Sequence, residues 1–147
     1  LMHEDDEDAA KSELKRIDHL VFVTLKYTRT VDVIRTIMSK FIAALDFKVE
    51  DYYNHILEKE KIDKIPLVPL VRMRKMEEMF PKDKTMKDIV DFYVMLRKVY
   101  NAEYRPREEY RKNVTLVTKQ KEVNIAILKE YSNLVIEYVN YMDELKK

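Results

Sequence analysis

Residues 97–112, RKVYNAEYRPREEYRK, interleave cations with tyrosines and are the stretch of this sequence whose residue types could best do chemistry. The stretch holds six Lys or Arg residues against three Glu residues. Guanidinium and ammonium groups neutralise phosphates, and tyrosine rings stack on unpaired bases. Single-stranded RNA or a nucleotide is therefore a physically reasonable ligand. The predicted contact residues are Arg97, Lys98, Tyr100, Tyr104, Arg105, Arg107, Arg111 and Lys112.

Two structural interpretations of the same stretch stay open. The tyrosines could face the core while the cations form surface ion pairs, as Glu108 and Lys112 would at helical spacing. Alternatively, the acidic N-terminal segment could fold back onto the cations. The charge distribution suits either view. Residues 64–121 contain 15 cations and 8 acids, whereas residues 1–63 contain 10 and 14. The formal net charge of +1 therefore conceals a basic middle.

Other chemistry has little support in the sequence. Asp51 and His55 are four residues apart, a spacing that suits two metal ligands on one helical face, but no further ligand pair accompanies them. None of the serines, Ser12, Ser39 and Ser132, lies in a nucleophile-elbow motif. The chain has neither Cys nor Gly, so it lacks thiolate sites and glycine-rich phosphate loops. We expect no metal, no cofactor and no catalytic residue.

The bulk composition is that of a folded protein. The 147 residues are 46% hydrophobic and 37% charged, which is enough for one domain with its own core. We expect an acidic, frayed tail at residues 1–8 and a single domain at 9–147. No apolar run is long enough to span a membrane, and no signal peptide is visible. We therefore expect a cytoplasmic protein, with a composition like that of thermophile proteins.

The elements that would position these residues are helical. Apolar residues recur at helical spacing from Leu14 to Leu45, which predicts one helix over about 9–46. Within it, VTLKYTRTVDV at residues 23–33 alternates like a strand, but its flanks favour helix. In the helical interpretation, Thr24 and Thr28 face the core or a partner. A bend at residues 46–50, a helix over about 49–63 and a connector at KIPLVPL follow.

The second half of the chain is predicted to be helical as well. Pro69 opens a helix over about 69–80, and Thr85 is a capping signal for another that reaches about Tyr104. Pro106 would then open the longest helix, over about 106–145, from its apolar heptad series. The predicted fold is an all-α, elongated bundle of about five helices, in which the two long helices bracket three shorter ones.

The segment FYVMLRKVYNAEY, the order of the helices and the chain length resemble HEPN-type helical domains. Many of those are small bundles that partner a nucleotidyltransferase, and several are ribonucleases. Active members carry an Arg–His pair at a wider spacing than Arg16 and His19 have here. The resemblance therefore transfers no catalytic residue and implies a non-catalytic or partner-binding member.

Polar residues interrupt the predicted apolar stripes and suggest an assembly role. Buried polar residues at heptad positions fix register and partner number in coiled coils. We therefore expect a non-enzymatic interaction module that self-associates or binds a helical protein partner, with the RNA- or nucleotide-binding domain as the alternative. The interrupting residues are Thr24, Thr28, Arg35, Lys121 and Asn124.

Overall fold

The computed structural model describes the backbone from Met2 to Lys147 and the side chains from Ala9 onward. The helical elements are α1 (Met2–His19), the π-helical turn η1 (Leu20–Thr24), α2 (Leu25–Tyr27), α3 (Val31–Glu58), α4 (Pro69–Met79), α5 (Lys84–Asn101) and α6 (Ile125–Glu144). Three short strands, β1 (Arg105–Arg107), β2 (Thr115–Val117) and β3 (Glu122–Asn124), lie between α5 and α6. α1 begins within the segment for which the sequence predicts an acidic tail.

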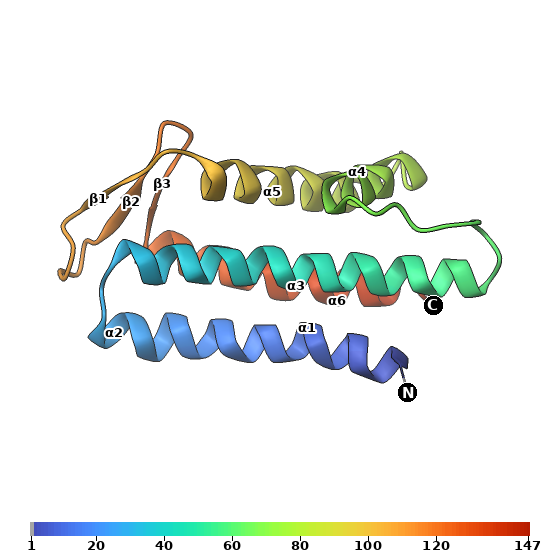
Figure 1. The fold of residues 1–147 in the computed structure, drawn as a ribbon, viewed down its shortest axis with the longest axis horizontal. Helices are drawn as coiled ribbons and strands as arrows, with labels where there is room; N and C mark the ends of the chain where they lie inside the picture. The colour runs from blue at the N-terminus through green and yellow to red at the C-terminus, as the bar shows by residue number, and fades with distance from the viewer. Residues whose placement is uncertain (1) are drawn as a thin grey trace.

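The protein is an elongated helical bundle, as predicted. α3 and α6 run side by side in the same direction through its middle, with α1 on one side and α4 and α5 on the other (Figure 1). The strands form a small sheet at one end of the bundle. One continuous hydrophobic core runs through α3, α5, α6 and the sheet, and the largest buried side chains include Tyr93, Phe41 and Ile34.

The predicted helix over 9–46 is wrong in one respect, because the chain turns back at Thr28–Thr30. Thr28 and Thr30 both leave helical backbone angles. The Thr30 hydroxyl accepts a 3.3 Å hydrogen bond from the Val33 amide and so caps α3. Residues 23–33 are thus neither a strand nor a continuous helix, but the end of one helix, a turn and the start of the next. Thr24 is half-buried, whereas Thr28 is exposed.

The predicted bend at residues 46–50 does not occur, and α3 continues through it to Glu58. No Gly or Pro interrupts this stretch, and Leu45 and Val49 continue its buried face. The helix ends in a Schellman motif: the Lys61 amide donates to the Ile56 carbonyl, and the Glu60 amide to the Leu57 carbonyl. Glu60 has a φ of 59°, the left-handed conformation in which glycine is usual.

The connector and the two following helices agree with the sequence. Pro69 occupies the first turn of α4, as predicted. α5 is capped by Asp83 rather than Thr85, because the Asp83 carboxylate accepts from the Met86 amide at 3.0 Å. The helix ends at Asn101 rather than near Tyr104.

The predicted helix over 106–145 is wrong in its first half, which forms the antiparallel sheet β1-β2-β3. Arg105 pairs with Val117, and Val117 with Glu122. The buried run Val114–Thr118 is rich in β-branched residues, which favour a strand. Pro106 lies in the exposed edge strand β1, a position that tolerates its missing amide.

The sheet also removes the polar heptad positions from any coiled-coil seam. Lys121 is exposed in the turn between β2 and β3. Asn124 caps α6 by accepting a 2.8 Å hydrogen bond from the Ile127 amide. Arg35 packs against two tyrosine rings, as described below. Self-association stays a prediction, but these residues no longer supply its basis. Within the described chain, none of the helices is both long and apolar enough to cross a lipid bilayer.

Candidate nucleic-acid interface

The structure does not gather the eight predicted contact residues at one site. Arg97 and Lys98 lie on α5 and face α4, where both line a groove between these helices. Tyr100 and Tyr104 lie at the end of α5 and just beyond it. Arg105 and Arg107 belong to β1, and Arg111 and Lys112 to the loop between β1 and β2.

Tyr100 and Tyr104 are occupied by an intramolecular cation. The Arg35 guanidinium lies 4.6 Å from the centre of the Tyr100 ring and 4.4 Å from that of Tyr104. Arg35 also donates a 3.0 Å hydrogen bond to the Tyr100 carbonyl. A base could not stack on the ring faces that Arg35 already covers. These two tyrosines therefore anchor the end of α5 to α3, and they are poor candidates for ligand contact.

Arg107 is likewise engaged. It forms a bidentate ion pair with Glu122, with nitrogen–oxygen distances of 2.7 and 3.1 Å. The Glu122 carboxylate raises the pKa of Arg107, and Arg107 lowers the pKa of Glu122. The pair spans the sheet from β1 to β3, so it also secures the short strands against each other.

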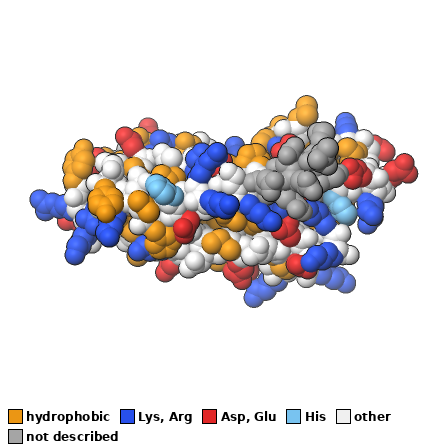
Figure 2. Space-filling view, turned by 90° about the horizontal axis from the view of Figure 1, so that it is seen from below, with side chains coloured by type: hydrophobic (Ala, Val, Ile, Leu, Met, Phe, Trp, Pro, Cys, Tyr) orange, Lys and Arg blue, Asp and Glu red, His pale blue; other side chains and the backbone are white. Residues whose placement is uncertain are grey.

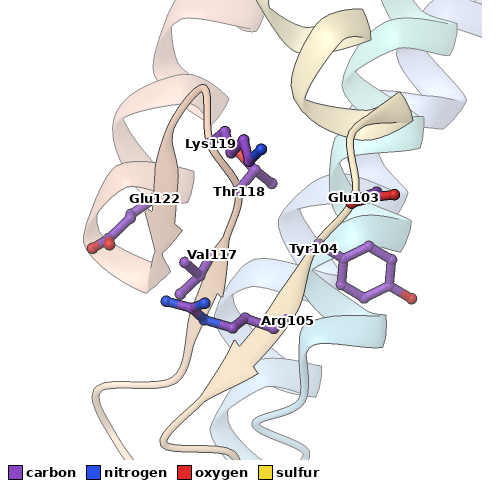
Figure 3. Close-up of a pocket in the computed structure, with 7 residues that line it drawn as sticks. All are labelled: Glu103, Tyr104, Arg105, Val117, Thr118, Lys119 and Glu122. Carbon is purple, nitrogen blue, oxygen red and sulfur yellow. The ribbon is translucent and has the colours of Figure 1, made fainter.

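A groove of about 420 Å³ lies between β1 and the β2–β3 hairpin. Figure 3 shows Arg105 and Lys119 among its lining residues, together with Glu103 and Glu122. Tyr104 points away from the hairpin in this view. The lining carries two cations and two carboxylates, of which Glu122 is also paired with Arg107, so the groove is of mixed charge and not uniformly basic.

The loop between β1 and β2 docks on the turn between α2 and α3. The Glu109 carboxylate accepts a 2.9 Å hydrogen bond from the Val31 amide, at the first turn of α3. The Tyr110 amide donates a 2.7 Å hydrogen bond to the Arg29 carbonyl. A carboxylate at a helix N-terminus is stabilised by the helix dipole and by the free amides there. These two bonds place Tyr110 beside Arg29.

Tyr110 is presented to solvent in an unfavourable backbone conformation. Its φ is 69° and its side chain is 77% exposed. Glu108, in the same loop, has a φ of 54°. A left-handed residue other than glycine costs about 1–2 kcal/mol. The loop therefore holds an exposed aromatic ring at a conformational cost, and such strain tends to occur at functional sites.

Further aromatic and basic residues lie near the turn between α2 and α3, on η1, α2 and α6. Phe22, in the π-helical turn η1, is 54% exposed, and the Lys129 ammonium lies 5.5 Å from the centre of its ring. Phe22, Lys26, Arg29 and Lys129 line a depression of about 170 Å³. Tyr27 is 79% exposed. Single-turn π-helical insertions are frequent at functional sites.

We call this region the sheet-end surface and define it as Phe22, Lys26, Tyr27, Arg29, Tyr110, Arg111, Lys112 and Lys129. Figure 2 views the molecule from the α1 side and shows hydrophobic and basic side chains together at the end where α2 and the sheet lie. The segments that come together here carry five cations and three exposed rings; of the two acids in the β1–β2 loop, Glu109 is engaged as a cap and Glu108 is exposed.

Sequence reasoning found only two members of this surface, Arg111 and Lys112. Tyr110 was part of the basic–aromatic stretch but was not singled out as a contact. Phe22, Lys26, Tyr27, Arg29 and Lys129 were missed because the turn at Thr28–Thr30 was not predicted. The TRT tripeptide, with Thr30 two residues before an acidic Asp32, was the signal that could have revealed a new helix start.

The residues weighed for metal binding have other partners. Asp51 is buried and accepts a 2.5 Å hydrogen bond from the Lys146 ammonium, while the His55 ring lies 6.5 Å from that of Tyr52. Among the residues whose side chains are described, no group of three or more His, Cys, Asp or Glu is placed to hold a metal ion.

The chain was compared with protein-family models, curated proteins and solved structures, and none of them matches it.

Proposed function

We propose that this protein is a non-enzymatic binding module whose sheet-end surface binds single-stranded RNA. The observation that carries the proposal is that two exposed aromatic rings, Tyr27 and Tyr110, lie on a turn and a loop that are docked together and that also carry cations. Stacking platforms beside phosphate-binding cations are the general means by which proteins hold single strands.

The chemistry of the surface favours a single strand over a duplex. Tyrosine rings stack only on unpaired, unstacked bases. Tyr27 and Tyr110 would therefore make no stacking contact with a duplex. Lys26, Arg29 and Lys129 lie near Phe22, and Arg111 and Lys112 follow Tyr110 directly. Cations on the same segments as the rings suit a ligand that carries a phosphate between successive bases.

The surface suits a binding role better than a ribonuclease role. A ribonuclease needs a general base or acid close to the bound phosphodiester. No histidine, and no carboxylate apart from the engaged Glu109, belongs to the contacts that join the β1–β2 loop to the α2–α3 turn. The sequence resemblance to HEPN-type domains supplied no catalytic residue either, which agrees with a binding role.

The proposal is tested by fluorescence anisotropy with labelled oligouridine at several salt concentrations. If all five cations contact phosphates, the logarithm of the association constant falls against the logarithm of salt with a slope of about −3.5. Tyr27→Ala and Tyr110→Ala each lower the affinity about fivefold or more, because one stacked base contributes about 1–3 kcal/mol. Neither variant changes the salt slope.

Leu67→Ser is the matched control, because Leu67 is 91% exposed but lies far along the chain from the sheet-end surface. We expect this variant to bind as the unaltered protein does. Absence of binding at low salt, a slope near zero, or tyrosine variants that bind like Leu67→Ser would each overturn the proposal.

A further inference from the structure

A second surface, separate from the sheet-end surface, lies where α4 packs beside α5 (Figure 1). A groove of about 660 Å³ runs between them. Leu70 and Arg74 line it from α4, and Val94, Arg97, Lys98 and Asn101 line it from α5. Ala102, just after α5, and Gln120, in the β2–β3 turn, complete the lining. On each helix these positions are three or four residues apart, so each set forms one stripe along its helix.

The α4 side of the groove continues into an apolar surface that is open to solvent. Leu67 is 91% exposed, Val68 54% and Val71 42%. Leu70, Val71 and Arg74 have the spacing of a single helical face at the start of α4, and Leu67 lies in the connector just before that helix. Apolar residues scattered singly on a surface are ordinary, but a contiguous cluster beside a groove indicates a docking site.

The polar lining of the groove carries one sign of charge. Arg74, Arg97 and Lys98 line it, and none of its lining residues is acidic. An adjoining depression of about 200 Å³ shares Val94 and Lys98 with it and adds Lys121. The carboxylate of this depression, Asp91, is engaged with Lys87 at 3.2 Å.

Arg97 is held in place from behind. Its guanidinium donates a 3.2 Å hydrogen bond to the Tyr93 hydroxyl, which in turn donates one of 2.6 Å to the Asp46 carboxylate. Burial raises the pKa values of both Tyr93 and Asp46. Because this network orients Arg97 before any ligand arrives, little side-chain entropy is lost when the arginine binds an anion.

We propose that the α4–α5 groove binds an acidic amphipathic helix of a protein partner. Apolar side chains of that helix would cover Leu67, Leu70 and Val71, and its carboxylates would face Arg74, Arg97 and Lys98. Helix-in-groove recognition uses this combination of apolar anchors at helical spacing and flanking charge. The exposed aliphatic cluster favours a protein over a nucleic acid, since it offers bases no ring to stack on.

The test uses the full-length protein and a phage-displayed library of random peptides about 16 residues long, which span about 24 Å as a helix. We expect the selected peptides to combine Asp and Glu with apolar residues at three- and four-residue spacing. Synthetic versions are then titrated against unaltered protein, Leu67→Ser, Arg74→Glu and Lys75→Glu. Lys75 is exposed on α4 outside the groove lining, so Lys75→Glu is the matched control for Arg74→Glu.

The proposal predicts that Leu67→Ser and Arg74→Glu each weaken peptide binding about tenfold, which corresponds to 1.4 kcal/mol, and that Lys75→Glu does not. Selection of no peptide, or of peptides without acidic enrichment, would overturn it. So would self-association, measured by light scattering, that Leu67→Ser abolishes, because a second copy would then cover the groove. Since Leu67→Ser leaves the sheet-end surface unaltered, failure here would not affect the RNA titration.

Discussion

The Glu109 carboxylate accepts a 2.9 Å hydrogen bond from the Val31 amide, across a sequence separation of 78 residues. This contact joins the loop between β1 and β2 to the first turn of α3. Together with the bond from the Tyr110 amide to the Arg29 carbonyl, it holds the β1–β2 loop, which carries Tyr110, on the turn between α2 and α3, which follows Tyr27. The sheet-end surface therefore depends on a helix cap supplied from the far half of the chain.

Removal of this cap should destabilise the protein. Glu109→Ala is expected to lower the free energy of unfolding by about 1 kcal/mol, because it removes both the acceptor and the charge at the start of α3. Glu109→Gln, which keeps an acceptor oxygen, should cost less. Urea denaturation monitored by circular dichroism measures both. Glu108→Ala is the control, and equal losses in all three variants would contradict the assignment of Glu109 as a cap.

The left-handed Glu60 at the end of α3 predicts a stabilising substitution. Glu60→Gly should raise the unfolding free energy relative to Glu60→Ala by about 1 kcal/mol, since glycine has no Cβ to strain at a φ of 59°. The comparison with alanine removes the effect of the lost charge. Thermal denaturation of the two variants gives the difference, and a glycine variant less stable than the alanine variant would show that Glu60 is not left-handed in solution.

The raised pKa of Tyr53 should make the folded protein less stable at alkaline pH. Burial raises its pKa from 10.0 to about 12, and its hydroxyl donates a 2.8 Å hydrogen bond to the Arg72 carbonyl. A group with a raised folded-state pKa contributes stability that is complete below pH 10 and lost as the pH rises towards 12. Tyr53→Phe should therefore show a shallower fall of unfolding free energy over this interval. Identical pH profiles would contradict the burial of an un-ionised Tyr53.

Replacement of the buried Lys48 should lower the stability of the protein strongly. It is 2% exposed, forms an ion pair with Asp143, and lies 3.8 Å from Asp51. Lys48→Met should destabilise the protein by about 3 kcal/mol, because it removes the buried cation and leaves Lys146 alone to neutralise Asp51 and Asp143. The control is Lys87→Met, which breaks the exposed pair with Asp91 and should change stability little. Equal effects in chemical denaturation would contradict a special role for the buried cluster.

Helical periodicity in the sequence correctly predicted the helical bundle, the connector and the start of α4 at Pro69. It failed where a pattern suited two structures. Val117 and Asn124 fit one heptad series and Val114 a second, interleaved one, yet the buried β-branched run at 114–118 contains the strand β2. The same limit applied at Thr28–Thr30, where a helix continues on either side of the turn and the apolar stripe alone does not show the reversal.

The candidate site was harder to predict for the same reason. The basic–aromatic stretch was conspicuous in the sequence, but its roles depend on partners far away. Arg35 covers Tyr100 and Tyr104, and Glu122 engages Arg107. Conversely, the segments that carry Tyr27 and Tyr110 are joined only through the contacts of Glu109 with Val31 and of Tyr110 with Arg29. Long-range contacts of this kind leave no local signal in composition or spacing.

The central claim is that RNA binds at the sheet-end surface, and mapping the contact tests it most directly. Oligouridine that contains thiouridine is crosslinked to the unaltered protein by ultraviolet light, and the modified peptides are identified by mass spectrometry. We predict crosslinks at Tyr27 and Tyr110, on the turn before α3 and on the β1–β2 loop. Crosslinks confined to Arg97 and Lys98 on α5, or none at a salt concentration that permits binding, would contradict it.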